Sequence, residues 1–353
     1  MTIDEWRDKI DEVDERLLEL LNERARAAQA IAGLKNKHEL PGFSPGRERQ
    51  IRQRLIDRNS GPLLPDAIKA IYREILSSCR GLENVPRVVF LGPPFSYTSI
   101  ACQEHFGSTI DALDVPTIPD VFAEVEKRVV DYGIVPIENT AEGGVNDILD
   151  MFTESEVKIC GETYLEIHHC LLAQNTLDDI AVIYSREIAL AQCKDWLKEN
   201  MPNAMLRSVS STSEGARLAS QEPNAAAVAH RLAADHYGLS VVAEHVEDIH
   251  HNKTRFLIIG NHEVAPSGVD KTTILFSLSH KPGSLYRALG ALDNAGINMT
   301  MITSRPARHT AWEYLFLVDF QGHRATEDVQ EVLSGMREHM HFLKILGSYP
   351  EAD

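Results

Sequence analysis

The first 36 residues carry apolar side chains at the spacing of one helix face. There is no proline between Thr2 and Asn36, and the one glycine in that stretch, Gly33, comes late. A helix of this length exceeds the mean of roughly 11–12 residues in globular proteins, so we expect its stripe to meet a partner in a bundle or coiled-coil-like pair. The stripe consists of Trp6, Ile10, Val13, Leu17 and Leu20.

Two further helices are predicted before residue 84. The stretch "PGFSPG" (41–46) reads as a loop, and residues 47–60 read as a second helix. Gly61–Pro62 and Pro65 break that helix, and residues 65–83 read as a third. We therefore expect an all-α domain over residues 1–84.

The period changes after residue 86. Strand-like runs at 87–92, 132–137 and 181–185 alternate with helix-like runs at 98–106 and 186–200. This alternation predicts an α/β domain over 87–263 with a mostly parallel sheet. Its last strand is the apolar run Phe256–Ile259, closed by Gly260. The Thr254–Arg255 pair precedes that strand. Thr254 is either a turn residue or a residue whose hydroxyl takes part in a reaction.

The tail repeats neither pattern. After a linker at 264–269, the segments "KTTILFSLSH", "KPGSLYRALGALDNAGI", "NMTMITSRPAR", "HTAWEYLFLVDFQGH", "ATEDVQEVLSGMREHM" and "FLKILGSYP" follow. They read as strand, helix, strand, strand, helix and strand. This predicts an α+β domain of the βαββαβ kind over 270–353.

Composition narrows the class of protein. Apolar content is 43% and charged content 25%, as in ordinary globular proteins, and the net charge of −17 argues against nucleic-acid binding. The acidic N-terminus lacks the features of a signal peptide, and no stretch approaches the roughly 20 apolar residues of a membrane span. Five cysteines without CxxC spacing favour neither a disulfide framework nor a zinc site. We expect a cytoplasmic protein with no bound metal.

Cations gather in the helical segment, although residues 1–83 are neutral overall, with 15 Lys+Arg and 15 Asp+Glu. Arg24 interrupts the apolar stripe, and Lys35 falls within about 20° of it on the helix face, some 16 Å along the axis. Arg47 can add a third cation. Such charges are usually solvated, but one that breaks an apolar stripe requires an anionic partner. Arg7 lies about 26 Å from Arg24, so it can reach the same small dianion only from a second subunit.

The helical segment resembles a known family. "WRDKIDEVDERLLELLNERARAAQAIAGLKNK" followed by "RER" is similar to the all-helical chorismate mutase domain, an intertwined dimer. The resemblance implies that Arg7, Arg24, Lys35 and Arg47 bind the carboxylates and ether oxygen of chorismate, with Glu48 near the ring hydroxyl. The pericyclic reaction needs no nucleophile, only a held conformer and cations facing the ether oxygen.

Two positions of the helical segment depart from the family pattern. Glu83 stands where the family often has glutamine, and an ionised carboxylate cannot donate to the ether oxygen. Ser44 stands where an acid often precedes "RER".

The middle segment carries the motif "VPIENTAEGGVNDILD" (135–150), in which Glu138 and Asn139 stand where a strand meets a loop. A structural strand–loop–helix is an equal alternative for this motif alone. Together with "ALAQC" (189–193) and "EHVEDIHHNKTRF" (244–256), it resembles prephenate dehydratase, with two α/β lobes like a periplasmic binding protein. The resemblance implies that Thr254 donates a hydrogen bond to the leaving hydroxyl of prephenate, and that Glu138, Asn139 and Gln192 lie near the substrate.

Two cleft loops depart from that family. The usual "GPEGTFS" reads "GPPFSYTS" (92–99), which keeps hydroxyls at Ser96 and Thr98 as substrate-binding candidates, and "SHPQAL" reads "SREIAL" (185–190). Arg255 either binds a substrate carboxylate or pairs with acidic residues in the core. The alternatives are therefore a weak, inactive or altered dehydratase, such as a prephenate decarboxylase, or a non-catalytic amino-acid sensor.

The tail resembles an ACT domain that binds phenylalanine. The loop "HKPGS" lets backbone amides face a carboxylate, and "TSRP" stands where the family has "ESRP". A plain dimerisation domain without a ligand is the alternative. The whole chain resembles bifunctional chorismate mutase–prephenate dehydratases. The resemblance implies an enzyme that needs no cofactor and forms a homodimer or a higher even oligomer. The effector-binding candidates are Pro282, Gly283, Ser284, Leu285, Thr303, Ser304, Arg305 and Pro306.

Overall fold

The computed structural model describes residues 1–37, 43–140, 143–144, 147–249, 251–278, 281–306 and 314–352. The chain divides into two compact units: Met1–Arg87 with Glu104–Asp111, and Val88–Gln103 with Ala112–Asp353. Within the described ranges, no helix combines the length and the apolar character that a membrane span requires.

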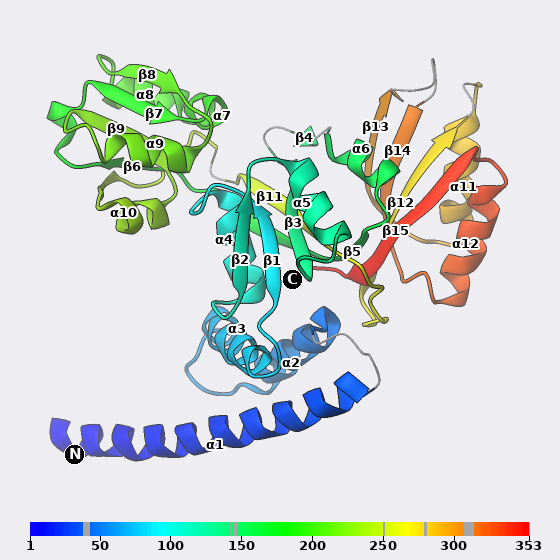
Figure 1. The fold of residues 1–353 in the computed structure, drawn as a ribbon, viewed down its shortest axis with the longest axis horizontal. Helices are drawn as coiled ribbons and strands as arrows, with labels where there is room; N and C mark the ends of the chain where they lie inside the picture. Colours follow the sequence, from blue (N-terminus) through cyan, green and yellow to red (C-terminus); the bar gives the residue numbers. More distant parts are fainter. Residues whose placement is uncertain are drawn as a thin grey trace. The chain divides into compact units, whose positions relative to one another are not determined.

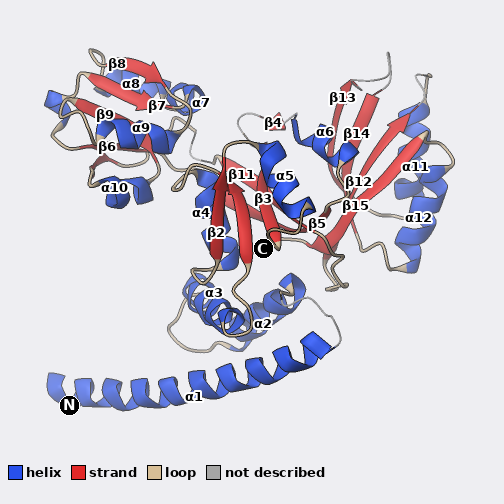
Figure 2. Ribbon diagram, viewed as in Figure 1, coloured by secondary structure: helices blue, strands red, loops and turns tan. Residues whose placement is uncertain are grey.

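Helices make up the first unit up to residue 81, in agreement with the expected all-α domain (Figures 1 and 2). They are α1 (Ile3–Lys37), α2 (Pro45–Arg58) and α3 (Pro65–Gly81). The last two begin with proline, whose missing N–H costs nothing in a first turn. The predicted stripe of α1 is confirmed as one face, but it is exposed in the single chain, with Trp6 55% accessible.

Before residue 264, the second unit contains two mixed sheets rather than mostly parallel ones. The first has the order β2-β1-β3-β11-β5, with β4 beside β3, and the second has the order β10-β6-β9-β7-β8. Strands β3 and β5 run antiparallel to β11, and β6 runs antiparallel to β9 and β10. The expectation of a mostly parallel sheet was wrong because the chain enters and leaves the second sheet directly, strand to strand, without a crossover helix.

The strands of the first sheet are β1 (Arg87–Leu91), β2 (Asp111–Val115), β3 (Tyr132–Asn139), β4 (Gly143–Gly144), β5 (Lys158–Glu166) and β11 (Lys253–Gly260). Those of the second are β6 (Cys170–Ala173), β7 (Val182–Ser185), β8 (Met205–Ser208), β9 (Ala225–Ala229) and β10 (Ser240–Ala243). The helices between them are α4 (Tyr97–Phe106), α5 (Ile118–Glu126), α6 (Asp147–Glu154), α7 (Glu187–Gln192), α8 (Lys194–Asn200), α9 (Thr212–Ala219) and α10 (Arg231–Tyr237), with the 3₁₀ turn Leu177–Asp179.

Two predicted elements of this domain differ in detail. The helix expected over 186–200 is two helices, because the Asp248 carboxylate accepts the N–H groups of Asp195 and Trp196 and gives α8 its own capped start. The strand expected from Phe256 begins at Lys253. Thr254 is therefore a strand residue, paired with Asn139 on one side and Leu165 on the other.

The tail forms the predicted βαββαβ fold: β12 (Asp270–Leu278), α11 (Ser284–Asn294), β13 (Met299–Pro306), β14 (Tyr314–Gln321), α12 (Glu327–Arg337) and β15 (Phe342–Pro350). Its antiparallel sheet has the order β13-β14-β12-β15. Side chains alternate between the two faces. Ile274 and Phe276 pack with the two helices, whereas Leu275 and Tyr349 share a core with Ile159 of β5.

Backbones approach closely where β15 meets β5. A Cβ atom on Gly347 would overlap the carbonyl oxygen of Ile159, so glycine is required at this position. The C-terminal domain therefore packs directly on the first sheet of the α/β domain.

Candidate active sites

Thr254 lies in β11, which pairs with β3 on one side and with β5 on the other. Its Oγ1 atom accepts a hydrogen bond of 2.8 Å from Nδ2 of Asn139, the last residue of β3. The same Nδ2 donates to Oδ1 of Asn252 at 2.7 Å, and Nδ2 of Asn252 donates to Oε1 of Gln192 at 3.1 Å. Three residues predicted from separate motifs, Thr254, Asn139 and Gln192, are thus joined through a fourth, Asn252.

The chain passes between the two sheets twice, from β5 to β6 and from β10 to β11. Glu247, in the second passage, accepts hydrogen bonds from Nδ1 of His168 at 2.9 Å and from the backbone N–H of His169 at 2.8 Å, both in the first passage. Nδ1 of His245 lies 3.3 Å from the same carboxylate. Burial opposes ionisation of Glu247, but these hydrogen bonds outweigh it and lower its pKa. The carboxylate therefore ties the two interlobe passages together.

Each of His168, His245 and Glu247 offers one possible metal-ligand atom, and these atoms lie within 4.8 Å of one another. Among the described residues, this is the group that is close enough to hold a metal ion. The sequence predicts no metal, and the hydrogen bonds to Glu247 account for the arrangement of these three side chains.

The altered loop 92–99 contributes one residue that the sequence reasoning missed. Ser96 donates to the carbonyl oxygen of Leu91 at 3.2 Å, and Thr98 is buried. Between them, the Tyr97 hydroxyl lies 2.7 Å from the carbonyl oxygen of His168 and 2.8 Å from Nδ1 of His169. Tyr97 is therefore the member of this loop that joins the polar network around His169.

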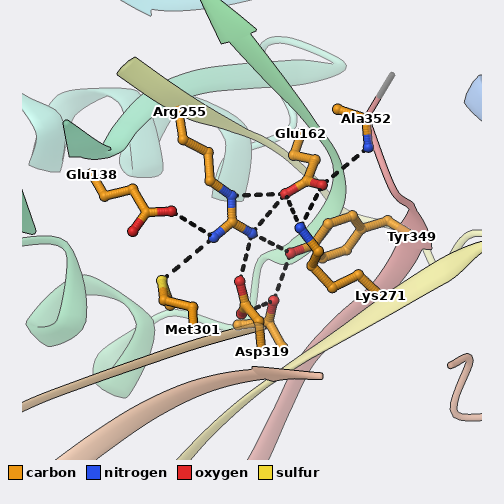
Figure 3. A network of polar contacts seen from close by, with 9 residues as sticks. Glu138, Glu162, Arg255, Lys271, Met301, Asp319, Tyr349 and Ala352 are labelled. Atoms are coloured by element: carbon orange, nitrogen blue, oxygen red, sulfur yellow. Dashed lines mark hydrogen bonds and ion pairs between the residues drawn. The ribbon is translucent and has the colours of Figure 1, made fainter. Parts of the chain in front are cut away.

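Thr254 and Arg255 are neighbours in β11, so their side chains face opposite sides of the sheet. Arg255 points into a buried ion network (Figure 3). Its guanidinium, on a side chain only 3% exposed, lies 2.7 Å from Glu162, 2.6 Å from Asp319 and 3.2 Å from Glu138. Of the two alternatives for Arg255, pairing with acidic residues describes this structure. Burial would lower the pKa of the guanidinium, but Tyr349, Asp319 and Glu162 raise it, so Arg255 stays charged.

The ion network joins two domains. Glu138 and Glu162 belong to β3 and β5, whereas Asp319 belongs to β14 of the C-terminal sheet. Lys271 of β12 lies 2.8 Å from Glu162, and the Tyr349 hydroxyl of β15 lies 3.1 Å from Nη2 of Arg255. Burial raises the pKa of Asp319, and the charge of Arg255 opposes that rise. One side of this network reaches Glu138, which is next to Asn139 and remains 37% exposed at its side chain.

Two of the predicted mutase residues, Arg24 and Glu48, contact side chains of α3. Nη1 of Arg24 lies 2.8 Å from Sγ of Cys79 in α3. Glu48 lies 3.3 Å from Nη1 of Arg80, a buried arginine that also covers the Phe43 ring. Arg80 was not predicted from the sequence. The sequence does show this arginine close to the apolar residues Leu76 and Cys79 of the third helix.

The remaining predicted mutase residues are spread along the unit. Arg47 is exposed near the start of α2, and Glu83 is half-buried just after α3. The Arg7 side chain is 71% exposed and pairs with Asp4 at 3.2 Å. Lys35 lies in α1, but its side chain is outside the described residues.

The structure describes the predicted effector loop from Lys281 onward. Gly283 adopts a left-handed conformation with φ of 81°, and Ser284 begins α11. Pro282 accepts a hydrogen bond of 3.2 Å from Arg287, and Leu285 packs on the core of this domain. Residues 279–280, the start of "SHKPGS", lie outside the described residues.

The second effector segment lies on β13, from Thr303 to Pro306. Within it, Arg305 pairs with Asp150 of α6. This ion pair gives the predicted effector region a direct contact with the dehydratase-like domain.

Comparisons with known proteins match all three parts. Family models described as chorismate mutase type II, prephenate dehydratase and ACT domain match residues 6–84, 88–264 and 272–337. A bifunctional chorismate mutase/prephenate dehydratase of Aquifex aeolicus is 44% identical, over 99% of this chain and 98% of that protein. The corresponding protein of Pseudomonas aeruginosa is 43% identical, over 98% of this chain and 96% of its own.

Solved structures resemble the part after the helical unit. The prephenate dehydratase of Arthrobacter aurescens in complex with L-Phe is 31% identical, with a TM-score of 0.70, and covers 75% of this chain and 90% of its own. GqqA, described as a novel type of quorum quenching acylase, is 30% identical, with a TM-score of 0.69, and covers 75% of this chain and 97% of its own. With all three family models in order and curated relatives matched along almost their full length, the chain belongs to the bifunctional chorismate mutase/prephenate dehydratase family.

Proposed function

We propose that the chain catalyses both reactions of its family, converting chorismate to prephenate in the helical unit and prephenate to phenylpyruvate in the two-lobed domain. The observation that carries the proposal is the convergence of Thr254, Asn139 and Gln192, from three separate motifs, on one hydrogen-bonded group between the lobes. The sequence identity over the whole chain supports the pairing of the two activities.

In the dehydratase reaction the bond from the ring to one carboxylate breaks, and its electrons make the ring aromatic as the C–O bond breaks. The departing oxygen needs a hydrogen-bond donor and finally a proton. Thr254 is a poor free acid, so we assign it a hydrogen bond to that oxygen rather than full proton transfer. Asn139 and Gln192 orient Thr254 and the substrate. Glu138 is the neighbour of Asn139 in β3, and Arg255 fixes its carboxylate.

In the mutase reaction the chain has only to hold chorismate in its reactive conformer and face the ether oxygen with cations. Arg24, Lys35 and Arg47 supply these cations within one chain. Arg7 lies 17 residues before Arg24 on the uninterrupted α1 helix, about 26 Å away, so it serves the site of a second chain. Glu48 is held near Arg80, where its carboxylate can accept a hydrogen bond from the ring hydroxyl of chorismate.

A homodimer built on α1 fits both observations on this helix. The apolar stripe from Trp6 to Leu20 is exposed in the single chain, and burying such a stripe against a second copy contributes roughly 25 cal/mol per Å² of apolar surface. The same contact would deliver Arg7 to the partner's site. A second copy is therefore the occupant we assign to this helix face.

Phenylalanine is the effector we assign to the C-terminal domain. The support is the L-Phe bound to the related Arthrobacter aurescens dehydratase and the left-handed Gly283 at the start of α11. Arg305 and Asp150 connect the predicted effector segment to α6, and Arg255 connects β14 to the strand of Thr254. Occupation of the effector site then lowers dehydratase activity.

A coupled assay tests the proposed activities. Chorismate is supplied to the full chain, and prephenate, phenylpyruvate and CO₂ are measured with and without phenylalanine. The proposal predicts prephenate followed by equal amounts of phenylpyruvate and CO₂, and slower dehydration with phenylalanine. CO₂ without phenylpyruvate would identify an altered decarboxylase instead, and prephenate as the final product would leave only the mutase.

A further inference from the structure

A line of hydrogen bonds continues behind Thr254 to a buried histidine. Asn139 donates to Thr254 and to Asn252, and Asn252 donates to Oε1 of Gln192. Nε2 of His169 lies 2.9 Å from that same Oε1 atom, and the His169 side chain is buried. Neither His169 nor Asn252 has a part in the roles assigned above, and neither touches the predicted substrate residue Thr254 directly.

The donor and the acceptor of each hydrogen bond in this line are determined by its neighbours. An amide nitrogen can only donate and an amide oxygen can only accept. Because Oε1 of Gln192 faces His169 and Asn252, both of these must donate to it. Oδ1 of Asn252 is then left to accept from Asn139, whose nitrogen also donates to Thr254. The Thr254 oxygen is an acceptor within the line, so its own proton is left to donate to a substrate oxygen.

We propose that His169 and Asn252 are positioning residues that fix Thr254 as a hydrogen-bond donor for the dehydratase reaction. A proton on Nε2 of His169 holds Oε1 of Gln192 in place, and this sets the orientation of the Asn252 and Asn139 amides in turn. If the imidazole proton were on Nδ1 only, Nε2 would accept a hydrogen bond and the amides of Gln192, Asn252 and Asn139 would each flip. The Thr254 hydroxyl would then donate its proton to Asn139 instead of to the substrate. The inference rests on the proposed dehydratase function.

The surroundings of His169 support this assignment. The Tyr97 hydroxyl has one proton and faces two atoms, Nδ1 at 2.8 Å and the carbonyl oxygen of His168 at 2.7 Å. Oε1 of Gln192 can only accept, so the hydrogen bond at Nε2 requires the imidazole proton on that nitrogen. Burial lowers the pKa of His169, while its bond to Gln192 and the charge of Glu247 act in the opposite direction. A neutral ring has one N–H, and here it is directed to Gln192. The backbone N–H of His169 donates to Glu247 at 2.8 Å, which fixes the backbone that carries the ring.

Matched substitutions separate positioning from packing. His169→Phe keeps the ring volume and removes the donor, whereas His169→Gln places an amide N–H near the position of Nε2. Asn252→Asp keeps an oxygen that accepts from Asn139 and loses the donation to Gln192. His262→Phe is the control, since His262 packs against Tyr132 and lies outside this line.

Dehydratase kcat and KM are measured on the full chain with prephenate, beside mutase activity and the unfolding temperature. Misplacing a reacting group by about 1 Å can cost on the order of 10²-fold, so we expect His169→Phe and Asn252→Asp to lose roughly 10–100-fold in kcat. Mutase activity, unfolding temperature and the His262→Phe control stay near wild type, and His169→Gln recovers part of the loss. A kcat of His169→Phe equal to wild type would overturn the inference.

A double-substitution cycle decides whether the line acts through Thr254. If it does, His169→Phe added to Thr254→Ala lowers kcat no further. Full additivity of the two losses would show that His169 acts by another route and would overturn the proposal. An unchanged Thr254→Ala, or wild type without phenylpyruvate, would instead refute the proposed function itself, so the two failures are distinguishable.

Discussion

Replacing Arg255 with methionine tests whether the buried ion network stabilises the packing of the ACT domain on the dehydratase domain. The substitution leaves Asp319 buried without its cation, which lies 2.6 Å away in the wild type. Breaking a buried pair from one side costs roughly 3–5 kcal/mol. Glu162 keeps Lys271 at 2.8 Å, so we assign most of the cost to Asp319. In a protein of this size the change lowers the unfolding temperature by on the order of 10 °C.

The loss depends on pH in a defined direction. Burial raises the pKa of Asp319, and Arg255 opposes that rise, so removing Arg255 raises the folded-state pKa further. A carboxyl whose pKa is higher in the folded state binds more protons there, and stability then falls as pH rises between its unfolded and folded pKa values. The destabilisation of Arg255→Met is therefore smaller at pH 5 than at pH 8.

The assay is thermal unfolding followed by circular dichroism at fixed protein concentration, with mutase activity as the control for a folded helical unit. Adding Asp319→Asn to Arg255→Met removes the unpaired charge and recovers part of the lost stability. An unfolding temperature equal to wild type, or a double variant no more stable than Arg255→Met, would refute the reasoning.

Three further predictions follow from individual residues. Mixing Arg7→Ala chains with Arg24→Ala chains, each inactive as a mutase, restores part of the activity in hybrid dimers; hybrids that form and stay inactive contradict the role of Arg7 in a second subunit. Gly347→Ala lowers the free energy of unfolding by roughly 1–3 kcal/mol because its Cβ meets the Ile159 carbonyl, whereas Gly290→Ala in the open middle of α11 is neutral or stabilising, as denaturant titration can check. Glu83→Gln raises mutase kcat/KM at pH 8, because an amide can donate to the ether oxygen and an ionised carboxylate cannot; a fall would show that Glu83 does not occupy the position we assign to it.

The spacing of apolar residues was sufficient to predict the elements that have one regular apolar face. The long α1 helix, the three-helix segment and the βαββαβ tail were predicted because each has one regular apolar face. The two mixed sheets were not predicted as such. Strands β5, β6, β10 and β11 pair according to how the chain passes between lobes, and no period in the sequence encodes that route.

The site was predicted where a residue acts in a recognisable motif and missed where it acts through long-range contacts. Thr254, Asn139 and Gln192 stood in motifs, and the fold joins them. Asn252 was within a quoted motif, but its partner Gln192 lies 60 residues away. His169 and Tyr97 had no motif of their own, since their roles depend on a contact across 72 residues of chain.

The central claim is that one chain performs two reactions in two separate domains, with Thr254 serving only the second. The most direct measurement supplies chorismate to wild type, Thr254→Ser and Thr254→Ala and follows prephenate and phenylpyruvate over time. Losing one donor at a reacting oxygen typically costs on the order of 10²–10³ in rate. We therefore predict that Thr254→Ala forms prephenate at the wild-type rate and lets it accumulate, while Thr254→Ser retains more of the second step. Equal phenylpyruvate production by Thr254→Ala and wild type would contradict the account.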